Sequence, residues 1–404
     1  MEAELPNWAG GARVAEADEL PAIREVVARN ELTLFVEAPP LIQAMVRDIR
    51  QARRRVWLEI YIFLDDGAGR PVAEALKERA RAGLDVRVLY DAIGSQTTPR
   101  AFFRELEAAG VRVHSFHSLW EAFARFSPLR ILNRRNHRKL LVIDDRVAYF
   151  GGMNLVDQTQ ATPVAEADQQ PLSAGWRDVH VRLTGPGQVE VANSFQRSWR
   201  LALHQKVRPR PYLQRQAMLD DGAESIQFFD LGPGASRTRA TRLFLRLLRS
   251  AQRSVRLSMA YFLPVGSVLR ELIRTRKRGV RVEVVVPGES DVPLVQHATR
   301  YLYGKLLRRR FRIYERLGNM LHSKVMVVDD EWTVLGSCNL DARSLWINLE
   351  FVAVVHSRPL AQRVNEIIRD EMRHSRQITL REYQARDCWQ RVLDRSAWTF
   401  RWWL

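Results

Sequence analysis

One pattern occurs twice in this chain: HRKLLVIDDRVAYFGGMNL at 137–155 and HSKVMVVDDEWTVLGSCNL at 322–340. Each copy opens with His-x-Lys, continues with four apolar residues and then reaches Asp. Short apolar runs that are rich in branched side chains are typical of buried strands. We therefore expect a buried strand in each copy, and the recurrence makes these two segments the framework of the fold.

Two further blocks repeat in the same order. Residues 52–63 resemble residues 251–262, where a basic stretch leads into an apolar strand. Residues 81–91 resemble residues 277–287, where a helix end with its glycine precedes a second strand. Strands that alternate with helices in a duplicated order predict an α/β fold, with two duplicated lobes that are each a β-sheet flanked by helices.

The domain boundaries follow from the repeat. We expect a first lobe at 1–205, a polar, proline-containing linker at 206–216, a second lobe at 217–376 and a tail rich in Trp and Arg at 377–404. The first lobe is the longer of the two between matched blocks, and its surplus falls in a basic, aromatic insert at 117–135.

The composition narrows the functional classes. A chain of 404 residues is long enough for two domains, and its formal net charge of +17 favours nucleic acid, an anionic membrane or phosphate-bearing substrates. The surplus is mainly arginine, which codon bias alone can also produce, so the charge by itself decides nothing. Two cysteines are too few for a disulfide framework or a cysteine zinc site. No apolar run or signal-peptide pattern predicts a membrane span or export.

The repeated strands carry the chemistry. Side chains two residues apart on a strand share a face, so His137 and Lys139 point the same way, whereas Asp144 has the opposite parity and is better placed to orient its neighbours. An imidazole beside an ammonium suits a phosphate, because the Lys neutralises charge while the His attacks phosphorus or protonates an oxygen. The predicted catalytic residues are His137, Lys139, Asp144, His322, Lys324 and Asp329.

Small residues and an asparagine follow each motif. They are Gly151, Gly152 and Asn154 in the first copy and Gly336, Ser337 and Asn339 in the second. Glycine permits close approach of the backbone to a phosphate, and the Asn amide donates hydrogen bonds to phosphate oxygens. A single His-x-Lys is commonly incidental, but two copies with matching downstream residues favour a functional site.

Two copies suit displacement at a phosphodiester, where one His attacks phosphorus and the other protonates the leaving alkoxide on the opposite side. Two lobes related by a pseudo-twofold axis, with the active site between them, would supply one His each. The intermediate would be a phosphohistidine. Neither motif has the clustered carboxylates of a two-metal site, so we expect neither a metal ion nor a cofactor.

These motifs resemble the phospholipase D superfamily, whose mark is a duplicated His-x-Lys-x4-Asp. The chain looks most like the bacterial cardiolipin synthases of the short type, which lack N-terminal transmembrane spans. The resemblance covers roughly residues 33–375 and includes GWRDVHVRLTGP at 175–186 and GSCNLDARSLWINLE at 336–350.

The resemblance implies a role for each histidine. His137 would be the nucleophile and His322 the general acid, although the sequence leaves their order open. The phosphate oxygens would be held by Lys139, Lys324, Asn154 and Asn339.

The resemblance also implies that a carboxylate orients each imidazole through its other nitrogen, and the matching residues are Asp178 and Glu350. By sequence alone, Asp178 fits the end of a surface strand equally well. Asp91 and Tyr261 also lie at predicted strand ends, and we expect both to be structural.

The activity implied by the resemblance is phosphatidyl transfer from one phosphatidylglycerol to another, which gives cardiolipin and glycerol. Water as acceptor would make the enzyme a phospholipase D, and phosphatidylethanolamine or another alcohol would be a different acceptor. A nuclease is the remote alternative, since superfamily nucleases typically resemble one lobe and dimerise. We expect no nucleic-acid partner.

A lipid enzyme without spans must lie on the membrane surface, at the cytoplasmic face of the inner membrane if the host is bacterial. The insert at 117–135 and the tail both combine aromatic and basic residues, which suits an anionic interface. The alternatives are an insert packed on its own lobe and a tail docked on the core. The aromatic or apolar residues in question are Leu119, Trp120, Phe123, Phe126, Trp389, Trp398, Trp402 and Trp403.

Overall fold

The computed structural model describes residues 23–116, 134–157, 175–205, 224–233 and 237–403. These residues form two compact units. The first lobe comprises the described residues up to 157 together with 179–205, and the second comprises 175–178 and the described residues from 224 onward. The predicted duplicated α/β fold is confirmed.

The first lobe contains one sheet of eight strands among its described residues, in the order β1-β2-β8-β7-β6-β3-β4-β5. The neighbours β3, β4 and β5 are parallel, and the other pairs are antiparallel. The strands are β1 (Ile23–Val27), β2 (Asn30–Phe35), β3 (Arg55–Ile60), β4 (Asp85–Asp91), β5 (Arg112–Phe116), β6 (Leu140–Ile143), β7 (Val147–Gly151) and β8 (His180–Thr184). The helices are α1 (Ala38–Arg50), α2 (Gly69–Arg81), α3 (Arg100–Ala108) and α6 (Gln188–Ala202).

The second lobe, over its described residues, also holds an eight-stranded sheet, in the order β16-β12-β11-β10-β13-β14-β15-β9. Its strands are β9 (Ser225–Leu231), β10 (Ser254–Met259), β11 (Arg281–Pro287), β12 (Arg312–Arg316), β13 (Lys324–Val328), β14 (Trp332–Gly336), β15 (Glu350–His356) and β16 (Ser375–Ile378). Its helices are α7 (Arg237–Ser250), α8 (Gly266–Lys277), α9 (Pro293–Leu307), α10 (Ala342–Trp346), α11 (Arg358–Arg373), α12 (Leu380–Ala385) and α13 (Cys388–Thr399).

Seven strands of each sheet correspond. The run β2-β8-β7-β6-β3-β4-β5 in the first lobe matches β9-β15-β14-β13-β10-β11-β12 in the second. The sheets differ at their edges, because β1 adds to β2 whereas β16 adds to β12. The repeat in the sequence is therefore a repeat of strand order.

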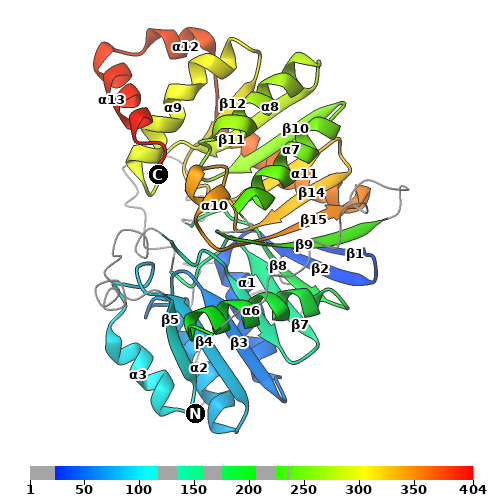
Figure 1. The fold of residues 1–404 in the computed structure, drawn as a ribbon, viewed down its shortest axis with the longest axis vertical. Coiled ribbons are helices and arrows are strands. Elements are labelled where there is room, and N and C mark those ends of the chain that lie inside the picture. Colours follow the sequence, from blue (N-terminus) through cyan, green and yellow to red (C-terminus); the bar gives the residue numbers. More distant parts are fainter. Residues whose placement is uncertain (1–22, 117–133, 158–174, 206–223, 234–236, 404) are drawn as a thin grey trace, which may run out of the picture. The chain divides into compact units, whose positions relative to one another are not determined.

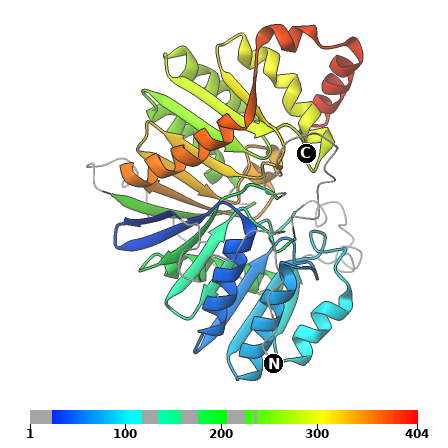
Figure 2. The ribbon, with the colours of Figure 1, turned by 180° about the vertical axis from the view of Figure 1, so that it is seen from behind.

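The motif strands lie in the middle of their sheets. All residues of β6 and β13 are buried, because helices cover both sheet faces, and this explains the continuous apolar runs. In the first lobe α1 lies on one face and α6 on the other (Figures 1 and 2). In the second lobe α7 and α8 lie on one face, and α11 crosses the opposite face (Figure 2).

Parts of the predicted organisation fall outside the described residues: the linker 206–216 and residues 117–133 of the insert. The tail does contain structure, since α13 packs along α9 of the second lobe. Over the described ranges, no helix combines the length and apolar character that crossing a bilayer would demand.

Candidate active site

The motif aspartates lie at the end of the motif strand that is opposite to the histidines. Asp144 follows β6, and its carboxylate accepts hydrogen bonds from the backbone amides of Arg53 (3.0 Å), Arg54 (2.8 Å) and Arg55 (3.0 Å). Burial opposes ionisation of this carboxyl, but the three amides outweigh it and lower the pKa of Asp144. The backbone at Asp144 is left-handed, with φ of 53°.

Asp329 repeats this arrangement in the second lobe. Its carboxylate accepts from the amides of Gln252 (2.8 Å), Arg253 (2.7 Å) and Ser254 (2.8 Å), and its φ is 55°. Each aspartate thus clamps the start of β3 or β10 to the end of the motif strand. This agrees with the expected orienting role. It gives no support to the prediction that the two carboxylates are catalytic, because they lie at the wrong end of the strand to reach a phosphate held by the histidines.

His137 and Lys139 come directly before β6 rather than inside it. The His137 ring meets the ring of Tyr61 edge-on, with centroids 5.1 Å apart. Lys139 is 1% exposed, donates to the His137 carbonyl (2.8 Å) and lies 5.1 Å from the Tyr61 ring centroid. The Oδ1 of Asn154 accepts from the amide of Ile62 (3.3 Å). His137, Lys139 and Asn154 therefore meet at the end of β3.

A buried polar network supports the residue before His137. The Asn136 side chain donates to Glu59 (2.8 Å), and the Asn136 amide donates to Asp91 (2.8 Å). Asp91 also pairs with Arg135 at 3.4 Å. Burial raises the pKa of Asp91, although Arg135 and the backbone amides oppose the shift. Asp91 holds the approach to His137, as its expected structural role requires.

His322 is oriented by Asp178, 144 residues earlier in the chain, through a contact of 2.7 Å between Nδ1 and the carboxylate. Lys324 Nζ lies 2.7 Å from the same nitrogen and also donates to the His322 carbonyl. A carboxylate only accepts, so Nδ1 donates to Asp178 and the lone pair of the neutral ring lies on Nε2. The structure thus selects the orienting role for Asp178 over a place at a surface strand end, since the residue is 1% exposed.

Short-range pairing holds Asp178 in place. The amide of Arg177 donates to Met320 (2.8 Å), and the amide of His322 donates to the Arg177 carbonyl (2.7 Å). The Arg177 side chain is anchored on α11 by Asp370 (3.2 Å) and Glu371 (3.4 Å). Segment 175–178 therefore pairs like a short strand with the residues that lead into His322.

The electrostatics of this pair favour neutral His322. Burial lowers its pKa, the charge of Lys324 lowers it further, and the hydrogen bond and charge of Asp178 oppose both effects. Burial also lowers the pKa of Lys324, against the charges of Asp178, Asp291 and Glu350. A bound phosphodiester would add negative charge and favour the protonated forms of both.

Three residues near the histidines were not found by sequence reasoning: Tyr61, Trp176 and Asp291. Trp176 lies 5.1 Å from the His322 ring, and Tyr261, which we expected to be structural, meets it edge-on at 6.4 Å. The Tyr261 hydroxyl donates to Asp291 (2.7 Å). The repeat contained a partial signal, because Tyr61 and Tyr261 lie at the ends of the matched blocks, although one position out of register.

Glu350 and Asp178 occupy equivalent positions in the two repeats. Gly151 pairs with His180 and Gly336 pairs with Val352, so Asp178 and Glu350 each come two residues before the partner of the motif glycine. Glu350 is fully buried and accepts from the Ser337 hydroxyl. Among the described residues, the buried Oδ1 of nearby Asn339 has no hydrogen-bond partner.

Gly151 and Gly336 are required for packing between strands, a reason that differs from the expected approach to a phosphate. A Cβ on Gly151 would lie 2.5 Å from the Cα of His180, and one on Gly336 would lie 2.2 Å from the carbonyl oxygen of Phe351. The close approach that requires glycine is therefore to the neighbouring strand. Gly336 also has a φ of 156°, which disfavours a side chain.

Two lobes with this strand order, each carrying a buried His-x-Lys at the start of a central strand, define a phospholipase D-type enzyme. The family model described as "Cardiolipin synthase, PLD-like domain" matches residues 45–165 and 244–372. The chain belongs to this family, which places it among the phosphatidyltransferases.

The relatives are bacterial cardiolipin synthases. The chain is 29% identical to the major cardiolipin synthase of Bacillus subtilis, over 90% of this chain and 73% of that protein. It is 31% identical to cardiolipin synthase A of Pseudomonas putida, over 93% of this chain and 74% of that one. Among solved structures, phosphatidylserine synthase of Haemophilus influenzae has a TM-score of 0.70 at 16% identity, covering 95% of this chain and 97% of that one. Polyphosphate kinase of Porphyromonas gingivalis has a TM-score of 0.57 at 14% identity, covering 92% and 53%. These two likenesses concern the fold alone.

Proposed function

We propose that this protein is a cardiolipin synthase that transfers a phosphatidyl group from one phosphatidylglycerol to a hydroxyl of a second, with release of glycerol. The observation that carries the proposal is the buried His322, whose Nδ1 is bound by Asp178, so that Nε2 is the ring nitrogen left to exchange a proton with the substrate. A second His-x-Lys of the same kind begins β6 in the first lobe. The family and its curated relatives support a phospholipid substrate.

In the proposed mechanism, His137 attacks the phosphorus of the first phosphatidylglycerol. The negative charge of the bound phosphate favours the protonated form of His322. As the bond from phosphorus to the glycerol oxygen breaks, this imidazolium gives its Nε2 proton to that oxygen. The phosphatidyl group is then carried on His137. His322 takes the proton from the acceptor hydroxyl as its oxygen attacks phosphorus, the bond from phosphorus to nitrogen breaks, and His137 is regenerated.

Other residues hold the participants. The ammonium groups of Lys139 and Lys324 neutralise the phosphate, and the amides of Asn154 and Asn339 donate to its oxygens. Glu350 occupies the position in the repeat that matches Asp178, and we assign it the His-orienting role that the resemblance implies. Asp144 and Asp329 act on the fold through the backbone and do not contact the reacting atoms.

We further propose that the protein works at the cytoplasmic face of the inner membrane, as a peripheral protein. A formal net charge of +17 supports attraction to anionic phospholipid. The phospholipid chemistry of the family makes this surface the place where the substrate is found.

The test uses the full chain with phosphatidylglycerol in mixed micelles containing EDTA, with lipid products read by mass spectrometry. His137→Ala and His322→Ala run beside His204→Ala, a matched control that alters a histidine outside both motifs. Cardiolipin from the wild type and the control, absent from both motif variants, is the expected result. Phosphatidic acid as the sole product would make the protein a hydrolase. No lipid product, even with phosphatidylethanolamine added, would refute the proposal and direct the assay to DNA.

A further inference from the structure

The outer face of α13 and the turn after it carry an exposed apolar stripe. Residues at 389, 392, 393 and 400 fall on one side of the helix, at intervals of three, four and eleven from the first. Their exposed fractions, with those of the two tryptophans that follow, run from 39% to 71%. The stripe consists of Trp389, Val392, Leu393, Phe400, Trp402 and Trp403. Exposed apolar side chains that gather on one element are candidates for an interaction site.

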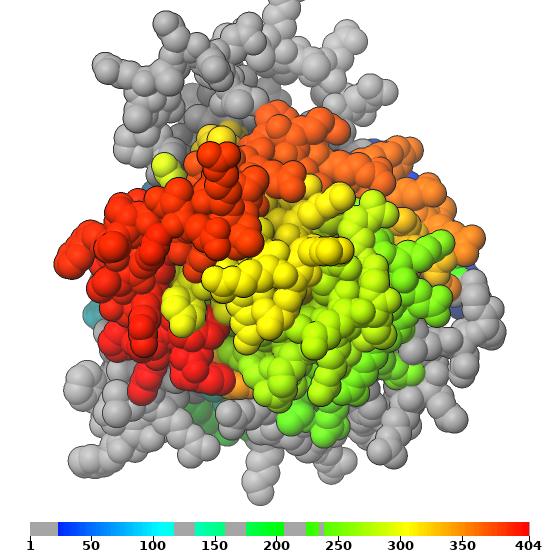
Figure 3. Space-filling view, turned by 90° about the horizontal axis from the view of Figure 1, so that it is seen from above, coloured from blue at the N-terminus to red at the C-terminus, as the bar shows by residue number. Residues whose placement is uncertain are grey.

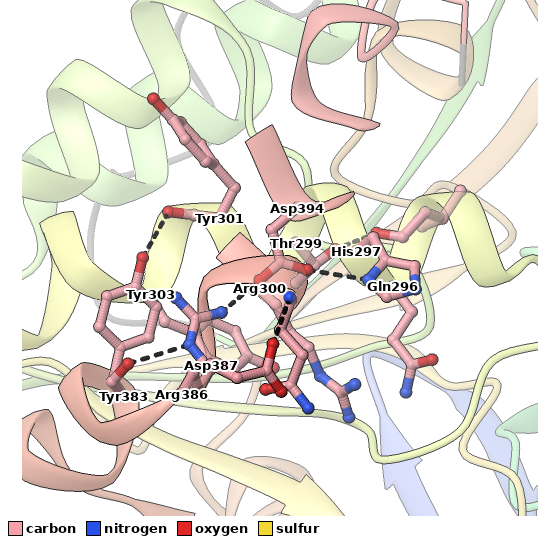
Figure 4. A network of polar contacts seen from close by, with 12 residues as sticks. Gln296, His297, Thr299, Arg300, Tyr301, Tyr303, Tyr383, Arg386, Asp387 and Asp394 are labelled. Carbon is pink, nitrogen blue, oxygen red and sulfur yellow. Dashed lines mark hydrogen bonds and ion pairs between the residues drawn. The ribbon is translucent and has the colours of Figure 1, made fainter. Parts of the chain in front are cut away.

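The opposite face of α13 is fixed to the second lobe. Asp394 is 2% exposed and accepts from His297 of α9 (2.8 Å) and from Arg386 (Figure 4). One turn further along both helices, Trp398 stacks on Tyr301 with centroids 5.3 Å apart. The helix is therefore packed on the second lobe through one defined face, and the exposure of the stripe does not come from a loose tail.

The turn after α13 is held as well. The Trp402 ring stacks on Trp346 at 5.6 Å, and the Trp403 carbonyl accepts from Arg343 (3.3 Å). Trp402 nevertheless keeps 43% of its surface exposed, and Trp403 keeps 70%. The Trp402 indole and the backbone of Trp403 are thus held at the surface, with both indoles exposed.

Basic side chains accompany the stripe. Arg391 and Arg395 are exposed on α13 itself. Contacts between α9 and α13 advance in the same direction along both helices, so the exposed Lys305 and the exposed arginines at 308–310 lie toward the same end as Trp402. Figure 3 shows the C-terminal segment, in red, beside the yellow segment that includes α9, on one face of this lobe.

We propose that this stripe docks the second lobe on an anionic phospholipid surface. Indoles favour the headgroup region of a bilayer, apolar side chains enter the boundary below it, and arginines attract anionic headgroups. The inference rests on the proposed function, because a phospholipid substrate is what brings this lobe to such a surface. To the proposed function, the inference adds that α13 contacts the membrane and that the exposed stripe is the face of the helix that does so.

The test compares binding to phosphatidylglycerol vesicles by sedimentation. The variant is Trp389→Ala/Leu393→Ala/Trp403→Ala, which changes exposed side chains and leaves Asp394 and Trp398 in place. Val26→Ala/Val189→Ala, which trims two exposed apolar side chains of the first lobe, is the matched control. We expect the stripe variant to bind about tenfold more weakly or worse, since interfacial affinity scales with buried apolar area, and the control to bind like the wild type. Point changes are sharper than deletion of 397–404, which would also remove the anchoring Trp398.

A second assay separates docking from catalysis. In detergent mixed micelles the stripe variant should form cardiolipin at the wild-type rate, because the substrate is then delivered without a bilayer. Unchanged vesicle binding by the stripe variant would overturn the inference. A stripe variant that binds vesicles normally but loses self-association in light scattering would overturn it in favour of a second copy of the chain. Stripe-dependent vesicle binding by a protein that makes no lipid product would refute the proposed function and leave the docking surface standing.

Discussion

The two lobes hold the aspartate end of the motif strand in the same way, whereas the side chains observed against each histidine come from positions that are particular to each lobe. Asp144 and Asp329 each accept three backbone hydrogen bonds, of 2.7 to 3.0 Å, at the start of the neighbouring strand. At the other end, the His137 ring meets Tyr61 edge-on. The His322 ring meets Tyr261 edge-on, lies near Trp176 and is bound by Asp178.

This difference separates what the fold needs from what the reaction needs. Backbone amides at a strand start have the same requirement in both lobes, so the clamp is the same. At the histidine end, the proposed mechanism asks for a nucleophile in one lobe and a general acid in the other.

The largest effect is expected from the histidines themselves. His137→Asn and His322→Asn should each lower cardiolipin synthesis by about 10³-fold or more, since each removes a group that makes or breaks a bond. Only the His322 variant should retain a phosphatidyl group on the protein, trapped by acid-free mass spectrometry after brief exposure to phosphatidylglycerol. A trapped adduct on His322 in the His137 variant would reverse the assigned roles.

The next effect concerns the carboxylate on His322. Asp178→Asn should lower kcat/KM by about 10²-fold or more, because the imidazole loses the partner that fixes its tautomer. Asp178 raises the pKa of His322, so its loss lowers that pKa. His322 then loses its proton at a lower pH, so the alkaline limb of the kcat/KM profile should move to lower pH. Glu350→Gln is the comparison in the other lobe, and an unmoved alkaline limb for Asp178→Asn would exclude His322 as the acid.

A third test uses a carboxyl that only the second lobe has. Asp341 stands where the first repeat has Val156. It is buried, and burial, with the charge of Glu350, raises its pKa to about 7 against hydrogen bonds from Ser344. A carboxyl whose pKa is raised in the folded state destabilises the fold when it is ionised. The free energy of unfolding therefore falls as the pH rises from the pKa of this carboxyl in the unfolded chain through about 7.

Asp341→Asn keeps an acceptor for the Ser344 amide at the start of α10. The variant should gain on the order of 3 kcal/mol over the wild type between pH 5 and pH 9. The measurement is Tm across that range, with Asp387→Asn at the exposed cap of α13 as control. A parallel pH dependence in wild type and variant would contradict the assignment.

The smallest effect, and the one that should be equal in both lobes, is at the clamps. Asp144→Ala and Asp329→Ala should each cost roughly 2 kcal/mol, since three amides lose a charged acceptor. We expect Tm to fall by about 5 °C, while the folded fraction keeps nearly all of its activity. Asp145→Ala removes an exposed neighbour that pairs with Arg54 and Arg55, and is the control. Loss of activity without loss of stability would restore the catalytic assignment of Asp144 and Asp329.

The order of amino acids is sufficient to predict the duplicated α/β lobes, the buried strands at 140–143 and 325–328, and the two His-x-Lys pairs. These features are local: they follow from apolar periodicity, from spacing and from recurrence, and each can be read within a short stretch of chain. The resemblance added the pairing of one carboxylate with each histidine.

Which residues meet becomes visible in the folded protein. The fold brings Asp178 to His322 and places Trp176 and Tyr61 against the imidazoles. It also packs Gly151 and Gly336 closely against a neighbouring strand and buries one particular face of α13. The physical reason is that such contacts depend on strand order and register between segments far apart in the chain, and a pattern along one segment contains no information about its partner across the sheet.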